Sequence, residues 1–243
     1  MSEGGAAVMD GAGAGRGAGP VSSSVGDYLK AIWSLVGEGV AATGEVAREL
    51  GVTAPSVTAM LSKLSGAGLV TYEPYRGASL TSAGLREALR LVRRHRLLEM
   101  FMVTELGVGW EEVHAEAELM EHVVSDSFTE RLAAHLGHPE FDPHGLPIPR
   151  ADGTVPTGPA VPLADGPVPG RFRVGRVAAT DAAVLAYLEA NGVVPGAELL
   201  LRSLEPGGNL VHVELAAAVG GAARRFALSR ELAAAVLGEP MND

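Results

Sequence analysis

One segment in the middle of the chain concentrates titratable side chains at helical spacing. Residues 112–126, EVHAEAELMEHVVSD, hold five acidic residues and two histidines in fifteen positions, interleaved with Val, Leu and Met. Four of these residues stand at i, i+4, i+7 and i+8: His114, Glu118, Glu121 and His122. At about 100° per residue this spacing places all four on one stripe of an α-helix. His95 and Glu99, at i and i+4, form a second such pair upstream.

The chemistry that suits these residues is the binding of a divalent cation. Clustered carboxylates raise one another's pKa and cost stability, and a metal ion removes that cost. Oxygen and imidazole ligands without sulfur suit Mn(II) or Fe(II), and Zn(II) also fits. The chain has no cysteine, which excludes thiolate ligands and disulfides. A solvated acidic face with incidental histidines is the alternative interpretation.

A hydrolytic metal site is the rival interpretation of the same residues. The chain lacks an HExxH motif, a serine elbow and a phosphate-binding glycine loop. Asp142 and His144 lie in a proline-rich segment, where we predict a turn.

The elements that must position these residues follow from apolar periodicity and turn signals. Residues 68–84 alternate apolar and polar side chains around Tyr75-Arg76-Gly77, which predicts a two-stranded ribbon. Helices are predicted over 22–37, 43–50, 54–66, 85–106 and 110–136. The order helix, glycine-containing turn, helix and ribbon over residues 43–80 is that of a winged helix-turn-helix.

The leading end of the third helix suits contact with DNA. Small and hydroxyl side chains there favour close approach to phosphates and base edges, and a basic residue at the ribbon tip can reach the backbone or the minor groove. The candidate DNA-binding residues are Thr53, Pro55, Ser56, Thr58 and Arg76. Residues 21–100 hold 9 Lys/Arg and 7 Asp/Glu, whereas the other 163 residues hold 10 and 22. A phosphate-binding face therefore fits the N-terminal third. An ordinary helical hairpin is the alternative.

The remainder of the chain has a different character. Residues 138–170 contain nine prolines and no helical period, which indicates a stiff linker. Short Val/Leu-rich runs over 171–238 predict a small β-barrel. The Gly/Ala-rich start of the chain predicts disorder. Without an apolar run long enough for a bilayer or a secretory signal, we expect a cytoplasmic protein with no membrane partner.

These motifs together resemble the diphtheria-toxin-repressor, or iron-dependent repressor, family of metal-dependent transcriptional regulators. Over residues 22–150 the matching pieces are VGDYLKAIW, APSVT, YEPYRGASLTSAG, RHRLLE, EEVHAEAELMEHVVSD and FDPHGLPIP. Residues 171–238 resemble the SH3-like domain, related to the ferrous-transport accessory (FeoA) fold, of many members. The implied fold is mainly α with small β. Its expected parts are a disordered tail (1–21), a winged helix-turn-helix domain (22–94), a helical metal-binding and dimerisation domain (95–150), a proline-rich linker (151–170) and the SH3-like β-barrel (171–238).

The resemblance also implies two metal sites. The primary site would use Asp27, Glu118, Glu121 and His122; the ancillary site would use His95, Glu99 and His114, with Asp181 as a further candidate ligand from the SH3-like domain. Iron-responsive members have Met and Cys where this chain has Asp27 and Glu118, whereas the manganese transport regulator branch has Asp and Glu. Some members of that branch carry a second acidic residue where this chain has Lys30.

The function implied is that of a homodimeric repressor, not an enzyme, that binds double-stranded palindromic operator DNA with Mn(2+) as co-repressor and no small organic substrate. Manganese uptake genes are the expected targets. An Fe(2+)-responsive repressor of iron uptake is the alternative, and other divalent metals can substitute. A metal-dependent hydrolase and a metal-independent winged-helix regulator also stay open. The dimer seam is expected to include Leu97, Leu98, Phe101 and Met102.

Overall fold

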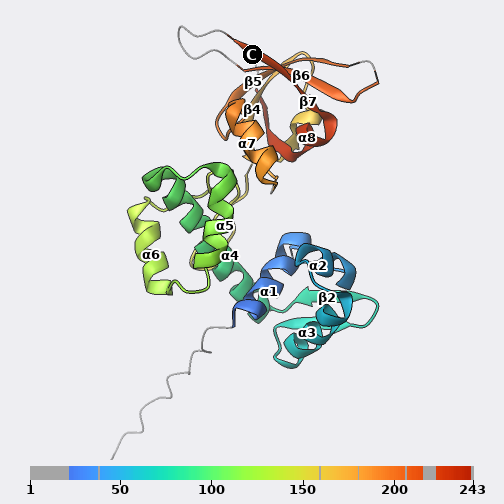
Figure 1. Cartoon of the computed structure of the whole chain (residues 1–243), viewed down its shortest axis with the longest axis vertical. Helices are drawn as coiled ribbons and strands as arrows, with labels where there is room; N and C mark the ends of the chain where they lie inside the picture. Colours follow the sequence, from blue (N-terminus) through green and yellow to red (C-terminus); the bar gives the residue numbers. More distant parts are fainter. Residues whose placement is uncertain are drawn as a thin grey trace, which may run out of the picture.

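The structure is a computed structural model that describes residues 22–241 except 38, 159, 180, 206 and 216–222. Figure 1 shows three bodies along the chain: a blue to teal N-terminal unit, a green helical unit and an orange to red C-terminal unit. The predicted disorder of residues 1–21 lies outside the described residues. Within them, no helix is both long enough and apolar enough to cross a membrane.

The N-terminal unit is the predicted winged helix-turn-helix. It contains α1 (Ser23–Val36), α2 (Thr43–Glu49), α3 (Ala54–Gly66), β1 (Val70–Glu73) and β2 (Gly77–Leu80). The two strands pair antiparallel, from Val70 opposite Leu80 to Glu73 opposite Gly77. Helix α3 has the predicted bounds. Its start is fixed because Thr53 accepts a hydrogen bond from the Ser56 N–H and Pro55 stands in the first turn. Buried side chains of α1 and α3 share one core, including Leu29, Ile32, Val57 and Leu61.

The helical unit contains α4 (Ser82–Leu106), α5 (Trp110–Met120) and α6 (Asp126–His135). The prediction of one continuous helix over 110–136 is therefore wrong, since residues 121–125 form a turn. Ser125 caps α6 by accepting from the Phe128 N–H at 3.2 Å, and Arg94 of α4 binds Asp126 at 2.7 Å. This cap and this ion pair start a new helix where the apolar period alone would continue the old one.

The predicted dimer seam is wrong for three of its four residues. Leu97, Leu98 and Met102 are buried within the helical unit itself, with Val113, Ala117, Leu132 and Ile148. Phe101 packs against that cluster and is partly buried. The exposed apolar side chains of this unit are instead Leu106, Leu119, Met120, Val123 and Phe128.

The predicted linker is not a free spacer. Arg93 donates to the Pro149 carbonyl at 2.9 Å and Arg96 donates to the Pro147 carbonyl, which attaches residues 139–150 to α4. The later part, β3 (Val161–Pro162) and the short 3-10 helix η1 (Leu163–Asp165), belongs to the C-terminal unit. Leu163 is fully buried there, so its burial explains why this stretch folds.

The C-terminal unit is a six-stranded antiparallel sheet in the order β3-β8-β4-β5-β6-β7. Its remaining elements are β4 (Gly170–Val177), α7 (Ala182–Ala190), β5 (Glu198–Leu204), β6 (Leu210–Leu215), β7 (Arg224–Ser229), α8 (Arg230–Ala235) and β8 (Val236–Met241). Register shifts at Val174/Arg176 and Leu201/Ser203 bend the sheet, which curls around its core in Figure 1.

This C-terminal unit docks on the helical unit. Trp110 of α5 is buried in the C-terminal core, and its ring centroid lies 4.9 Å from that of His144. The Val177 N–H donates to the His144 carbonyl at 2.7 Å. Gly145, with φ +81°, brings its backbone against Gly175 so closely that a side chain would have no room. The two units therefore share an apolar contact and a backbone hydrogen bond.

Candidate metal centres and nucleic-acid interface

The first group of candidate ligands joins the winged unit to the helical unit. Asp27 comes from α1, whereas Glu121 and His122 come from the turn after α5, and their donor atoms lie within 4.8 Å of one another. His122 Nε2 is 2.8 Å from Asp27 Oδ1 and 3.5 Å from Glu121 Oε1. Gly26 lies beside this group: a Cβ there would be in ordinary contact with His122 Cε1 at 3.4 Å and in tight contact with Leu91 Cδ2 at 3.0 Å.

The electrostatics of this group favour a cation. Burial raises the pKa of Asp27, His122 opposes the rise, and the charges of Glu118 and Glu121 add to it. The Glu121 side chain is 0% exposed. A positive charge that enters beside Asp27 would stabilise its carboxylate and oppose this rise.

The second group forms around His95. Its Nε2 lies 2.9 Å from Glu99 Oε1 and 3.0 Å from His114 Nδ1, while His114 Nδ1 lies 3.2 Å from Glu99 Oε1. The structure thus brings together the three residues of the expected ancillary site. On the other side of the ring, His95 Nδ1 lies 2.5 Å from Glu121 Oε2. Burial disfavours protonation of His95, but hydrogen bonds with Glu121 and Glu99 outweigh it and raise its pKa to about 9.

Glu118 is placed differently from the expected grouping. Its candidate donor atom groups with His95 and His114, not with Asp27, and its Oε1 accepts from Lys30 Nζ at 2.5 Å. Burial raises the pKa of Glu118, but the Lys30 charge and hydrogen bond outweigh it and bring the pKa below its ordinary value. The four residues placed on one stripe by spacing are therefore divided between two adjoining groups.

A third group, not anticipated from the sequence, contains Glu99, Asp142 and His144, all buried. Asp142 Oδ1 accepts from the N–H groups of His144 and Leu146 at 2.9 Å each, which is the predicted turn role. Asp142 Oδ2 and His144 Nε2, however, are buried without a hydrogen-bond partner among the described residues. Most buried polar atoms in proteins have a hydrogen-bond partner, so these two atoms are candidates to bind an ion or a water molecule.

The pKa values of this third group are displaced toward the neutral forms. Burial raises the pKa of Asp142 to about 7, and the charge of Glu99 adds to that rise. Burial also lowers the pKa of His144. The only ion-pair partner of Asp142 among the described residues is Arg96, whose Nε lies 3.6 Å from Oδ2. The sequence signal was present in FDPHG, but a turn accounts for only one of the two carboxylate oxygens.

Asp181 is not brought to any of these groups. Its Oδ1 accepts from the Val184 N–H at 3.0 Å and caps α7, and the residue is exposed. Most of the ligand candidates instead line one cavity of about 1100 Å³, whose walls come from α1, α4, α5, the proline-rich segment and the C-terminal unit.

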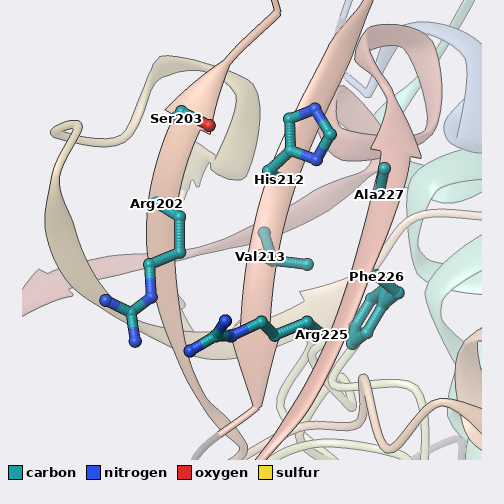
Figure 2. A pocket seen from close by; sticks show the side chains of 7 residues that line it. All are labelled: Arg202, Ser203, His212, Val213, Arg225, Phe226 and Ala227. Carbon is teal, nitrogen blue, oxygen red and sulfur yellow. The ribbon is translucent and has the colours of Figure 1, made fainter.

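A separate hollow lies on strands β5, β6 and β7 of the C-terminal sheet, and Figure 2 shows the seven side chains that line it. Arg202 and Arg225 point toward its lower end in Figure 2, and each lies 2.7 Å from Glu214. Both guanidinium groups share the single carboxylate of Glu214, so each of them has an ion-pair partner and the three side chains together keep one positive charge.

The candidate DNA-binding residues all lie on the surface of the winged unit. Thr53, Pro55, Ser56 and Thr58 are exposed on the leading end of α3. At the ribbon tip the Arg76 side chain is 80% exposed and pairs with Glu73 at 3.0 Å. Tyr75 beside it is fully exposed with φ +67°, which makes it an additional candidate for DNA contact. Exposed polar side chains therefore lie both at the leading end of α3 and at the ribbon tip.

A winged helix-turn-helix joined through carboxylates and imidazoles to a helical unit defines a metal-responsive DNA-binding protein as the class. Family comparison agrees over most of the chain. "Iron dependent repressor, N-terminal DNA binding domain" matches residues 21–78, "Iron dependent repressor, metal binding and dimerisation domain" matches residues 81–150, and "FeoA domain" matches residues 161–240.

Individual relatives lead to the same group. The "Iron-dependent repressor IdeR" of Mycobacterium leprae is 32% identical over 199 residues, which cover 76% of this chain and 86% of that protein. The "HTH-type transcriptional regulator MntR" of Lysinibacillus sphaericus is 38% identical over 111 residues, covering 45% of this chain and 79% of that protein. A structure titled "Manganese-dependent transcriptional repressor complex with manganese" superposes with a TM-score of 0.80 at 36% identity, covering 89% of this chain and 100% of the other.

The chain belongs to the iron-dependent repressor family. It is a metal-dependent, DNA-binding transcriptional repressor with a dimerisation domain and a C-terminal FeoA, or SH3-like, domain. The family consists of repressors and not enzymes, so the hydrolase interpretation does not hold. The expected fold class is confirmed.

Proposed function

We propose that Mn(II) is the co-repressor of this protein and that Asp27, Glu121 and His122 hold it, with Glu118 as a fourth ligand. The observation that carries the proposal is the donor set: the carboxylates of Asp27 and Glu121 and the imidazole of His122 lie within 4.8 Å of one another, and the chain has no cysteine. Hard oxygen donors suit Mn(II), whereas softer donors favour later transition metals. Asp142 Oδ2 and His144 Nε2 are buried without hydrogen-bond partners among the described residues, and they lie in one group with Glu99. These three side chains could bind a further metal ion.

The proposal is supported by relatives whose names include manganese, among them the manganese-dependent repressor with a TM-score of 0.80. A relative named as an iron-dependent repressor keeps Fe(II) as the second candidate. Imidazole and carboxylate ligands also bind Fe(II). The donor set of this chain nevertheless favours the manganese assignment.

The mechanism follows from where the ligands are attached. Leu29 and Ile32 of α1 are fully buried in the same core as α3, so α1 and α3 move together. The ion supplies a positive charge that attracts ligands from both units. Asp27 on α1 and Glu121 after α5 then hold the winged unit in one orientation. In a dimer, this orientation sets the spacing of two α3 helices for a palindromic operator.

The test is an operator titration with Mn(II), Fe(II) and Zn(II) in turn, at one fixed salt concentration. The wild type is expected to bind a palindromic operator tightly with Mn(II) and weakly with chelator present. Asp27→Asn should lose the Mn(II) effect and keep its fold. Asp181→Asn is the matched control, because Asn also caps helices and Asp181 lies outside the ligand groups. An unchanged Mn(II) response of Asp27→Asn would contradict the assignment.

The metal preference has its own test. Replacing Asp27 with Met and Glu118 with Cys converts two hard donors to soft ones, which should move the response from Mn(II) toward Fe(II). A double variant with the wild-type metal order would show that selectivity resides elsewhere. The same proposal gives the role of the protein in the cell, which is that of a cytoplasmic repressor of manganese uptake genes.

A further inference from the structure

Lys30 occupies the boundary between the first two ligand groups. It stands three residues after Asp27 on α1, so both side chains face the helical unit. Its Nζ donates to Glu118 Oε1 at 2.5 Å and to the Glu121 oxygens at 2.8 and 2.9 Å. It also lies 3.2 Å from His95 Nδ1. One ammonium group thus touches two carboxylates and one imidazole.

This environment is the one that a bound cation would have. Glu121 is fully buried and the Lys30 side chain is only 16% exposed, so water does little to screen their charges. Asp27, Glu118 and Glu121 bring three carboxylates close together, and Lys30 is the only lysine or arginine in contact with Glu118 or Glu121 side chains among the described residues. Buried carboxylates require such compensation, from an ion or from the protein.

We propose that Lys30 is a resident cation that takes the place of a second divalent ion between the Asp27–Glu121–His122 group and the His95–His114–Glu118 group. The inference rests on the proposed metal-binding function. Lys30 holds one oxygen of Glu118 and both of Glu121. The single ion of the proposed co-repressor site would therefore enter from the Asp27–His122 side and share the carboxylates of Glu118 and Glu121 with Lys30. The group formed by Glu99 and the Nε2 edge of His95 lies on the opposite side of that ring and is unaffected.

The proposal predicts how the number of bound ions depends on residue 30. Lys30→Glu replaces the ammonium with another carboxylate, so a further Mn(II) should bind between Glu118 and Glu121. The variant is expected to bind one more Mn(II) per subunit than the wild type, measured by equilibrium dialysis and elemental analysis. Lys63→Glu is the matched control: it makes the same charge change at an exposed position of α3 and should leave the count unchanged. An equal count in Lys30→Glu and the wild type would overturn the proposal.

A measurement without metal separates this proposal from the co-repressor assignment. Lys30→Gln keeps much of the side-chain length and removes the charge, so the metal-free protein should unfold at a lower urea concentration than the wild type. A Lys30→Gln midpoint equal to that of the wild type would overturn the resident cation whatever the metal results. If Lys30→Gln is destabilised but the wild type binds neither Mn(II) nor Fe(II), the co-repressor proposal fails and charge compensation by Lys30 stands. If Lys30→Glu folds only when Mn(II) is present, that result supports the extra site.

Discussion

Docking of the SH3-like domain can be tested at a single glycine. A Cβ at residue 145 would overlap the Gly175 carbonyl oxygen and lie 2.7 Å from Arg176 Cα, so Gly145→Ala should force the two units apart. Gly145 also has φ +81°, a backbone conformation that Ala adopts at a cost. Gly137→Ala is the matched control, because Gly137 has φ +75° with no atom within 4 Å of the added Cβ. The difference between the two variants isolates the loss of docking from backbone strain.

The expected magnitudes differ by several kcal/mol. Left-handed strain alone costs about 1–2 kcal/mol, which is the whole expected effect of Gly137→Ala. Undocking by Gly145→Ala would also expose the Trp110 ring, now 5% exposed. An aromatic side chain buries about 150–250 Å² at about 25 cal/mol per Å², so this loss adds about 4–6 kcal/mol. The added figure is an upper value, since the unfolded chain already covers part of that surface.

The assay is urea unfolding followed by tryptophan fluorescence. The chain has two tryptophans, and a Trp33→Phe background leaves Trp110 as the reporter. Gly145→Ala in this background should show a red-shifted Trp110 emission before unfolding and a larger radius of gyration by X-ray scattering. Gly137→Ala should keep the wild-type emission. If both glycine variants have the same emission and the same midpoint, the domain is not held at this contact.

Three further outcomes follow from single side chains. Arg76→Ala should weaken binding to all operator sequences by a similar factor, because it removes one phosphate contact. Titrations at several salt concentrations should show that the slope of log affinity against log salt is smaller by about 1. Asp126, held by Arg90 and Arg94, has a lowered pKa, so its stabilisation is present above its unfolded pKa and disappears as the pH falls through the folded one. Asp126→Asn should therefore lose about 0.5–1 kcal/mol in urea unfolding at neutral pH and converge with the wild type in strong acid. Leu119→Glu should weaken dimerisation about tenfold in analytical ultracentrifugation, because Leu119 is 74% exposed on the dimerisation domain.

The elements that the sequence predicts well are those fixed by local signals. Helix α3 begins where predicted because Thr53 and Pro55 lie at its start, and a local turn signal, Gly68 with φ +71°, follows its end. The sequence does not predict the break between α5 and α6, because Val123 and Val124 continue the apolar period. Contacts from α4 to Asp126, more than thirty residues away, help to set that break. The apolar periodicity of one segment contains no information about contacts with residues so far away in the sequence.

The candidate metal ligands also include some that local sequence predicts and some whose partners depend on tertiary contacts. His95 and Glu99 were found because both lie on one helix face four residues apart. The separation of Glu118 from Asp27 depends on Lys30, which reaches across 88 residues of sequence. Asp142 was assigned to a turn, and one oxygen does form it; the burial of its second oxygen comes from packing against α4 and the C-terminal unit. Local chemistry therefore identified ligand types, whereas tertiary packing decided their partners.

The resident cation changes what the metal has to do. If the carboxylates were uncompensated, a metal ion would be needed simply to let the winged unit approach the helical unit. Lys30 already links α1 to Glu118 and Glu121 without a metal. An ammonium on a flexible stem attracts carboxylates from many directions, whereas a divalent ion imposes a coordination geometry on its ligands. The additional effect of metal binding must then arise at Asp27 and His122, where it sets the direction of α1 and hence of α3.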